Sequence, residues 1–250
     1  MKKGVKASTI GKGIGCAVLL FLALFPIYWL IAMAIRPTSE MEGSVSLLPQ
    51  SLTFEYFTDL FQNEGFGQAI LNSVQTTFGS LIISLLAGIC AAYVIARRRF
   101  KFGLKQPMTY WVLLIRVLPP VAFVIPLYIM FNQIGLINTK IPVLLACVLI
   151  NVPLIIWFLL SFFQELPDEV EESAKVDGAT EWQLFYKIVL PLVAPGIAAV
   201  AMLSFMYAWN EYTYTVIFTR SSMNNTVPLA LALLNTEDSL TNFGLVAAGG

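Results

Sequence analysis

The chain has 250 residues, of which 58% are hydrophobic and only 12% are charged, and its formal net charge is zero. An ordinary soluble domain has about 25% charged residues, so this composition argues against a soluble globular protein. The absence of histidine excludes catalysis by a Ser-His or Cys-His pair and zinc chemistry of the HExxH type. The neutral net charge provides no basic surface for nucleic acid, and no P-loop motif for binding ATP occurs.

The charged residues are clustered, and they leave uncharged stretches long enough to cross a bilayer, which takes about 20 apolar residues in a helix. Four stretches contain no charge, and a fifth is interrupted only by Arg116. We therefore predict an all-α polytopic helical membrane protein whose prolines are tolerated inside the spans. The five expected spans cover about 13–35, 72–96, 107–131, 141–163 and 192–218. Cys16, Cys90 and Cys147 lie in these segments and are expected to be small packing residues.

The distribution of lysine and arginine predicts the orientation of the spans. Eleven basic residues lie in segments 1–12, 97–105 and 164–190, whereas the loops between the other span ends hold three. Since basic residues concentrate on the cytoplasmic side, the N-terminus is expected in the cytoplasm.

The second span carries a small residue at every fourth position, which places these residues in a seam on one helix face. The seam consists of Ser80, Ser84, Gly88, Ala92 and Ala96. Helices in lipid associate through such close contacts, so we expect a tight structural contact with another helix here.

The loop before the second span contains an amphipathic pattern. Thr53 precedes Phe54, Phe57, Leu60 and Phe61, a spacing that predicts a short helix. Its apolar face would either rest on the membrane surface or pack on the helical bundle.

Residues 164–191 form a loop between the fourth and fifth spans that is predicted to be an ordered helix–turn–helix. Pro167 and the acidic residues after it suit the start of a helix, and Gly178 is placed to end it in a left-handed conformation. Thr180 and Gln183 form a capping-box signature for a second helix with an aromatic face. We expect Pro191 to end that helix. The physics leaves two roles open, docking to another protein or an interfacial helix pair on lipid.

This loop resembles a motif of the membrane subunits of ATP-binding-cassette importers, E-A-A-x3-G-x9-I-x-L-P. The chain has Glu172, Ser173 and Ala174, then Gly178, then Ile188, Leu190 and Pro191, with every spacing matched and with serine in place of the more usual alanine. Further strings resemble the sugar-importer branch, and its maltose-type smaller permease subunit in particular. They include Arg36-Pro37-Thr38, Leu71-Asn72-Ser73, Lys175-Val176-Asp177-Gly178-Ala179 and Trp209-Asn210-Glu211.

The resemblance implies the type I importer transmembrane fold, a single permease domain over 1–250 containing a coupling loop at 164–191. It implies a multi-pass subunit of a prokaryotic inner membrane, without a catalytic site, metal or cofactor of its own. ATP and magnesium would be bound by two separate ATPase subunits that grip the loop, with Glu172 pairing with a basic residue there. The other implied partners are a second permease subunit and a soluble solute-binding protein that delivers a carbohydrate.

The family usually has a sixth span. Residues 243–250 resemble the start of that span, and we expect a longer chain in which it is complete.

Arg116 and Glu211 are the ionisable residues well inside apolar runs, so both are candidates for the substrate pathway. Tyr207 and Asn210 are further candidates for the substrate pathway, because they lie near Glu211 in the sequence. The two charges lie at depths that differ by about 14 Å along their helices, which argues against a direct pair. The alternatives are an aromatic belt at the outer interface for Glu211 and its neighbours, and snorkelling or a partner helix for Arg116.

Three other function classes stand as alternatives. An importer permease for a non-sugar substrate has the same motif. A secondary transporter would show an inverted repeat and acids at mid-membrane, and neither is evident. An intramembrane enzyme lacks the histidine or paired aspartates that it would need.

Overall fold

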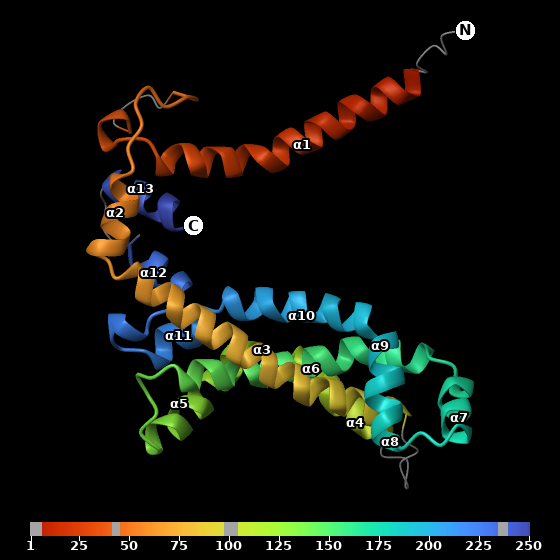
Figure 1. The fold of residues 1–250 in the computed structure, drawn as a ribbon. Helices are drawn as coiled ribbons and strands as arrows, with labels where there is room; N and C mark the ends of the chain where they lie inside the picture. The colour runs from red at the N-terminus through yellow and green to blue at the C-terminus, as the bar shows by residue number, and fades with distance from the viewer. Residues whose placement is uncertain (1–6, 42–45, 98–104, 235–239) are drawn as a thin grey trace. The chain divides into compact units, whose positions relative to one another are not determined.

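The computed structural model describes residues 7–41, 46–97, 105–234 and 240–250, and these residues form helices and connecting turns without a β-strand. Figure 1 shows the order of the helices along the chain. The chain divides into two compact units, the first made of Met1–Gly67 with Ala230–Gly250, and the second of Gln68–Leu229. The prediction of an all-helical fold is confirmed.

The first unit is built on three helices: α1 (Ala7–Ala34), α2 (Glu55–Gln62) and α13 (Leu240–Gly249). A short 3₁₀ turn, η1, spans Thr38–Glu40. Helix α13 packs on both α1 and α2. A Cβ atom at Gly244 of α13 would lie 2.4 Å from the ring of Tyr56 on α2, so only glycine permits this close approach.

The amphipathic helix predicted after Thr53 is present as α2, but its buried face is different from the expected one. Tyr56 and Leu60 are buried, whereas Phe54 and Phe61 are exposed. The expectation that this helix packs on other helices therefore holds for one face of α2, where Tyr56 contacts α13. The exposed phenylalanines leave the other face apolar.

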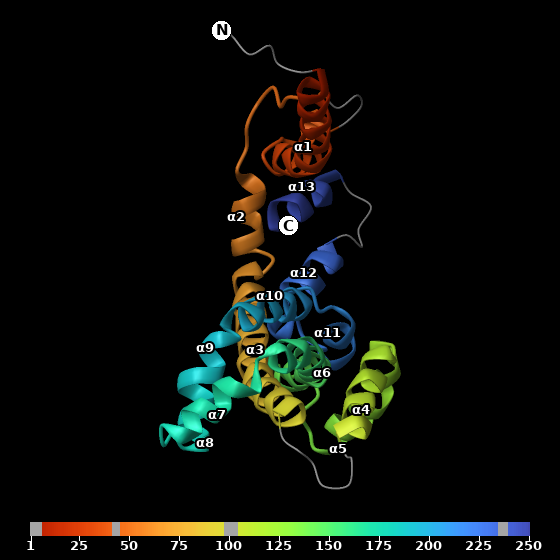
Figure 2. The same ribbon diagram turned by 90° about the vertical axis from the view of Figure 1, so that its right-hand side faces the viewer.

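The second unit holds most of the remaining helices, and α6 (Ile141–Glu165) is its centre. Helices α10 (Ala194–Trp209) and α4 (Lys105–Val117) both pack on α6. Figure 2 shows α6 surrounded by its neighbours when the molecule is turned. This unit also contains most of α3 (Phe66–Arg97), together with η3 (Pro120–Phe123), α5 (Val124–Gln133), α11 (Thr213–Phe218), η5 (Ser222–Asn224) and the helical segments between α6 and α10. Helix α12 (Val227–Leu234) begins in this unit and continues into the first.

The small-residue seam predicted on the second span is confirmed. All five of its residues are buried, and Gly88 approaches α6 closely. A Cβ atom at Gly88 would lie 2.6 Å from Cγ2 of Ile155 on α6, which is closer than real Cβ contacts. The seam therefore brings α3 and α6 together at a distance that a larger residue at Gly88 would not allow.

Three of the five predicted spans are continuous helices. Gly11–Ala34, Phe66–Arg97 and Ile141–Glu165 are long and apolar enough to cross a membrane, and two bent helix pairs bring the number of possible crossings to five among the described residues. The expected spans 13–35, 72–96 and 141–163 are confirmed within a few residues, except that the second begins at Phe66.

The third predicted span is not one straight helix. Helix α4 ends at Val117, and the pair Gln106–Val117 and Pro120–Gln133 is bent by 98°. Two adjacent prolines, Pro119 and Pro120, explain the break, because each lacks a backbone N–H and disfavours a helical residue before it.

The fifth predicted span is also interrupted. Helix α10 ends at Trp209, and the chain leaves the helix before α11 begins at Thr213. At the other end, α10 is bent by 73° from the helical segment Glu181–Leu192. The stretch 192–218 therefore consists of separate helical pieces.

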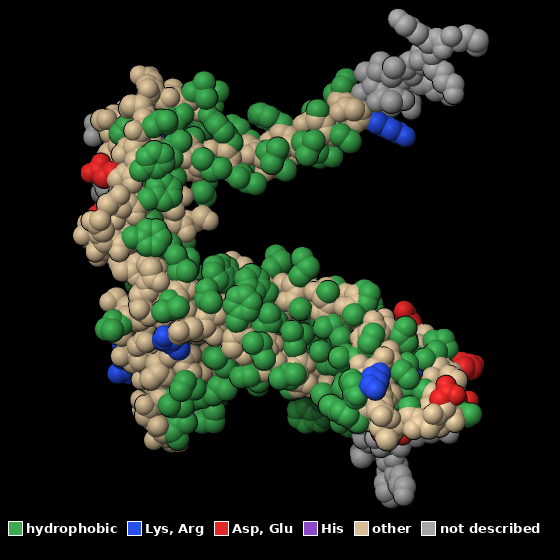
Figure 3. Space-filling model, viewed as in Figure 1, with side chains coloured by type: hydrophobic (Ala, Val, Ile, Leu, Met, Phe, Trp, Pro, Cys, Tyr) green, Lys and Arg blue, Asp and Glu red, His purple; other side chains and the backbone are tan. Residues whose placement is uncertain are grey.

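The surface of the chain is largely apolar, as a bilayer would require. Figure 3 shows hydrophobic side chains covering α1 and much of the second unit. Cys147 is buried, as expected of a packing residue, whereas Cys16 and Cys90 are exposed within this apolar surface.

Candidate functional site

The loop between α6 and α10 begins with α7 (Asp168–Val176), whose start and end follow from local sequence. Pro167 precedes it with φ −60°, and its first turn contains Asp168, Glu169 and Glu171. Carboxylates are favourable there because the helix N-terminus carries partial positive charge. Gly178 follows with φ +82°, which confirms the predicted left-handed end of the helix.

The second helical segment starts with the predicted capping box. The Thr180 hydroxyl accepts a hydrogen bond from the backbone N–H of Gln183 at 3.2 Å, and the Gln183 side chain accepts one from the N–H of Thr180 at 3.0 Å. A single α-helical turn, α8 (Glu181–Gln183), follows. The segment then winds as a π-helix, η4, over Leu184–Val189.

The prediction that Pro191 ends this helix is wrong. Pro191 lies inside the next turn, α9 (Leu190–Leu192), and the sharp bend comes after it, at Val193. Proline deprives the preceding turn of one hydrogen-bond donor, and a local π adjustment is one way in which a helix accommodates that loss.

The loop buries one face and presents the other. Ala174, Leu184 and Val189 are buried in a core that also contains residues of α3, α6 and α10. Phe185 packs on Tyr93 of α3 with ring centres 4.9 Å apart. The opposite face is exposed: Val176 has 87% of its surface accessible and Trp182 has 67%.

The residues of the importer motif fall on both faces. Glu172, Ser173, Gly178 and Pro191 are exposed, Ala174 is buried, and Ile188 and Leu190 are half-buried. The exposed members leave a surface for a partner, while Ala174, Ile188 and Leu190 anchor the loop to the spans.

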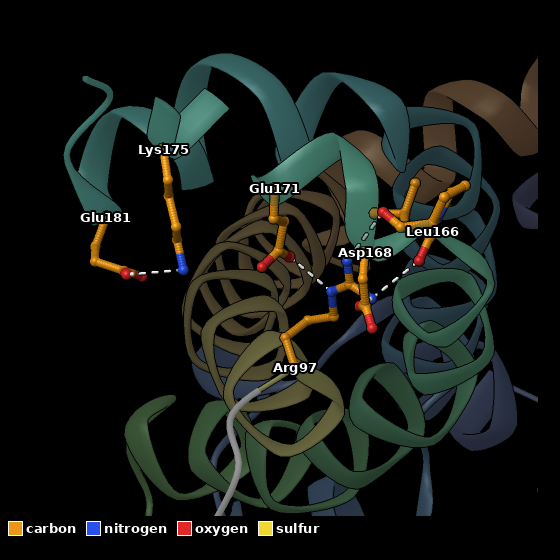
Figure 4. A network of polar contacts seen from close by, with 7 residues as sticks. Arg97, Leu166, Asp168, Glu171, Lys175 and Glu181 are labelled. Carbon is orange, nitrogen blue, oxygen red and sulfur yellow. Dashed lines mark hydrogen bonds and ion pairs between the residues drawn. The ribbon is translucent and has the colours of Figure 1, made fainter. Parts of the chain in front are cut away.

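An arginine at the end of α3 holds the start of the loop, as Figure 4 shows. Nε of Arg97 donates to Glu171 Oε1 at 2.6 Å, and Nη1 lies 2.9 Å from Asp168 Oδ1. Nη1 also donates to the carbonyl of Leu166 at 2.9 Å, and Nη2 donates to that of Pro167 at 3.4 Å. From the sequence, Arg97 contributed to the predicted orientation of the spans and was not paired with any residue of the loop. The acidic first turn of α7 was the signal that could have suggested this contact.

The charge of the loop surface is mainly negative. Acidic side chains gather over α7 and the turn after it in Figure 3. Lys175 and Glu181 form an ion pair of 3.2 Å across that turn, with both side chains about half exposed. Exposed pairs of this kind contribute little to stability.

The four substrate-pathway candidates lie in the second unit. Glu211 is buried, and its carboxylate accepts hydrogen bonds from the N–H groups of Tyr214 and Thr215 at 2.7 and 3.1 Å and from the Thr215 hydroxyl at 3.0 Å. The side chain of Asn210 donates to the carbonyl of Met206 at 2.7 Å. Glu211 therefore holds the start of α11.

Arg116 lies on α4 and Tyr207 on α10, and Tyr207 is close enough to interact electrostatically with both Arg116 and Glu211. The Arg116 guanidinium is exposed and lies 5.6 Å from the ring centre of Trp157 on α6. Tyr207 is half-buried on α10. No ion pair joins Arg116 to Glu211 among the residues that the structure describes. A role of these four residues in the substrate pathway stays a prediction.

A group of buried polar side chains on three helices was not predicted from the sequence. Ser84 of α3, Asn151 of α6 and Ser204 of α10 are fully buried, and the Asn151 amide donates to the carbonyl of Ser204 at 3.3 Å. The signal was present as polar residues inside apolar runs. It was weak because small hydroxyl residues also serve as packing residues between membrane helices.

Comparison with known proteins places this geometry in context. Residues 84–250 match the family described as "Binding-protein-dependent transport system inner membrane component". The trehalose transport system permease SugB of Mycobacterium tuberculosis is 33% identical over 228 residues, covering 91% of this chain and 82% of that protein. The arabinooligosaccharide permease AraQ of Halalkalibacterium halodurans is 32% identical over 245 residues, covering 94% and 84%. The fold is similar to that of a bacterial ABC transporter involved in the import of alginate (TM-score 0.79, 21% identity, covering 99% of this chain and 93% of that one).

Proposed function

Because the chain belongs to the family of binding-protein-dependent transport system inner membrane components, we propose that it is the permease subunit of an ATP-driven carbohydrate importer. It would form part of the translocation path in the inner membrane, with its N-terminus in the cytoplasm. A soluble binding protein would deliver the sugar. Two separate subunits would bind ATP and magnesium, so that this chain contributes no catalytic site.

The observation that carries the proposal is the geometry of the cytoplasmic loop. Its buried face is fixed to α3, α6 and α10, and its exposed face presents Glu172, Val176 and Trp182 at the end of the same unit. An exposed apolar and acidic surface on an ordered loop suits a protein partner with basic residues around an apolar pocket. Movement of such a partner would be passed directly to the three spans.

The substrate class is proposed from the relatives. SugB and AraQ are named as permeases for trehalose and arabinooligosaccharides, and both align with about nine-tenths of this chain. We therefore propose a disaccharide or short oligosaccharide as the transported molecule. A second permease subunit would complete the path.

The first experiment tests whether transport is driven by a separate ATPase subunit. The chain is co-expressed with its companion permease and the ATPase, and the complex is purified and placed in vesicles with the binding protein and labelled trehalose or arabino-oligosaccharide. The proposal expects co-purification of the ATPase and uptake that stops when ATP is removed. Uptake that follows an ion gradient and ignores ATP would contradict it.

The second experiment separates docking from backbone strain. Gly178 and Gly135 both have positive φ, +82° and +70°, and a Cβ atom at either would meet nothing within 4 Å in this chain. Alanine at either position therefore costs about 1–2 kcal/mol of backbone strain. We expect Gly178→Ala to weaken ATPase binding and transport, because its Cβ atom would face the partner, whereas Gly135→Ala leaves both nearly unchanged. Equal effects of the two substitutions would refute docking at Gly178.

Glu172 provides a charge test with a neighbouring control. Glu172→Ala should reduce the affinity of the ATPase subunit, because an interfacial charge pair is lost. Glu169→Ala changes another exposed carboxylate of α7 and should have a smaller effect. Membrane insertion of both variants is checked by their yield in the membrane fraction.

A further inference from the structure

The guanidinium of Arg97 joins the ends of three helices at one point. Arg97 is the last residue of α3. Its Nη1 and Nη2 atoms donate hydrogen bonds to the carbonyls of Leu166 and Pro167, in the turn between α6 and α7. Its Nε atom donates to Glu171 in the first turns of α7. All three side-chain nitrogens of Arg97 thus have partners on the other side of the α3–α7 contact.

Burial makes this contact stronger than an ordinary surface ion pair. The exposed fraction of the Arg97 side chain is 8% and that of Glu171 is 15%, whereas that of Asp168 is 80%. The Arg97–Glu171 pair is therefore screened little by water and salt, while the contribution of Asp168 is small. The two carbonyls fix the direction of the guanidinium, which has its donors in a planar fork. A lysine could not reproduce this set of contacts.

The contact lies at the base of the loop, not on its exposed docking face. Glu172, the next residue after Glu171, points to the exposed side of α7. Of these two neighbouring acidic residues, Glu171 thus faces α3, and Glu172 is available to a partner protein. The loop also meets α3 through apolar packing, which includes Phe185 on Tyr93.

We propose that Arg97 is a positioning residue that fastens α3 to the coupling loop, so that a displacement of α7 moves α3 together with α6. The proposal rests on the function proposed above and adds the route of the motion. Helix α3 contacts α6 closely along the buried seam at Gly88, so the fastened pair would move as one body. Without Arg97, the loop would still bind the ATPase but would transmit its motion mainly through α6 and α10.

The first test uses the complete importer in vesicles and measures ATP hydrolysis and sugar uptake separately. Arg97→Ala should leave ATPase binding intact and lower the sugar transported per ATP hydrolysed by about tenfold, a common size for coupling between sites. Arg97→Lys should fall between Arg97→Ala and the unchanged protein, because it keeps the charge and loses the forked contacts. Lys175→Ala removes the exposed ion pair in the same loop and should leave the ratio unchanged.

The second test replaces the ionic contact by a covalent one. In a background with Cys16→Ser and Cys90→Ser, both members of the pair are changed, as Arg97→Cys and Glu171→Cys, and joined by a short bifunctional maleimide. The unlinked protein should be uncoupled like Arg97→Ala, and linkage should restore uptake per ATP at least about fivefold. A residue needed only for folding would give no such recovery.

These results separate the inference from the function on which it rests. A normal transport ratio in Arg97→Ala, or a linked protein that transports no better than the unlinked one, would overturn the role of Arg97. Both outcomes leave the importer assignment standing if the unchanged complex still takes up sugar with ATP. Failure of the unchanged complex to bind an ATPase would instead overturn the proposed function.

Discussion

Glycine at position 88 is predicted to be essential for the packing of α3 on α6, and a matched glycine on the same helix provides the control. A Cβ atom at Gly88 would lie 2.6 Å from Cγ2 and 2.8 Å from Cβ of Ile155. Ile155 is fully buried, and its Cβ atom is fixed to the backbone of α6. Gly88→Ala can therefore be accommodated only if the two helices separate.

Gly79 looks similar by distance but differs in what it would meet. Its Cβ atom would lie 2.7 Å from Cδ1 of Leu144, the far end of a flexible side chain, and 3.7 Å from Cγ. A rotation of Leu144 relieves that overlap. Gly79→Ala should therefore be close to neutral, or slightly stabilising because alanine favours a helix by about 1 kcal/mol over glycine.

The magnitude for Gly88→Ala follows from two opposing effects. Overpacking costs about 1–3 kcal/mol, and the gain in helix propensity offsets about 1 kcal/mol of it. The resulting net loss of up to about 2 kcal/mol would lower the midpoint of thermal unfolding by up to about 8 °C for a chain of this size.

The assay is thermal unfolding of the purified complex in detergent, followed by tryptophan fluorescence, with the two variants measured side by side. A further variant, Gly88→Ala with Ile155→Ala, removes the Cγ2 atom, so its loss should be smaller than the sum of the two single losses. The reasoning is refuted if Gly88→Ala is as stable as Gly79→Ala, because the contact with α6 would then not depend on the missing side chain.

Two more predictions concern carboxylates outside the coupling loop. Hydrogen bonds from the Ser51 side chain and from the backbone N–H groups of Gln50 and Ser51 lower the pKa of Glu40 below its usual 4.5. A depressed pKa stabilises the folded loop above the usual pKa, and that stabilisation is lost as the pH falls through the lowered value. Cleavage by an acid protease at exposed Leu47 should therefore accelerate only below about pH 4.5. The Glu40→Ala variant should be cleaved quickly already above that pH. Glu211→Gln replaces an oxygen that accepts from Thr215 by an amide donor, so it should lower the free energy of unfolding by about 1–3 kcal/mol, measured by the same thermal assay, and an unchanged midpoint would contradict its role at α11.

Local chemistry made much of the fold and of the loop predictable. The small residues of the second span, the left-handed glycine at 178 and the capping box at Thr180 all act through neighbours in sequence or on one helix face, and the structure confirms each of them. The membrane class was predictable because uncharged apolar stretches of about 20 residues match the thickness of a bilayer core.

The predictions that failed depended on how several local effects combine. Prolines are tolerated in membrane helices, so Pro119 and Pro120 did not by themselves distinguish a kink from a bend of 98°. Pro191 was expected to stop a helix, but π winding before it absorbs the missing donor. Arg97 was not paired from the sequence because its partners lie 69 to 74 residues away.

The π-helical turn η4, before the fifth membrane crossing, changes which of its side chains lie on the same face of the helix. In an α-helix, residues five apart are rotated by about 140° from each other, since each residue turns about 100°. With bonds from residue i to i+5, such residues lie nearly above one another. Leu184 and Val189, five apart, are both fully buried. The extra residue in this π-helical turn thus allows Leu184 and Val189 to be buried in the same core. In an unbroken α-helix, the second of them would face water or lipid.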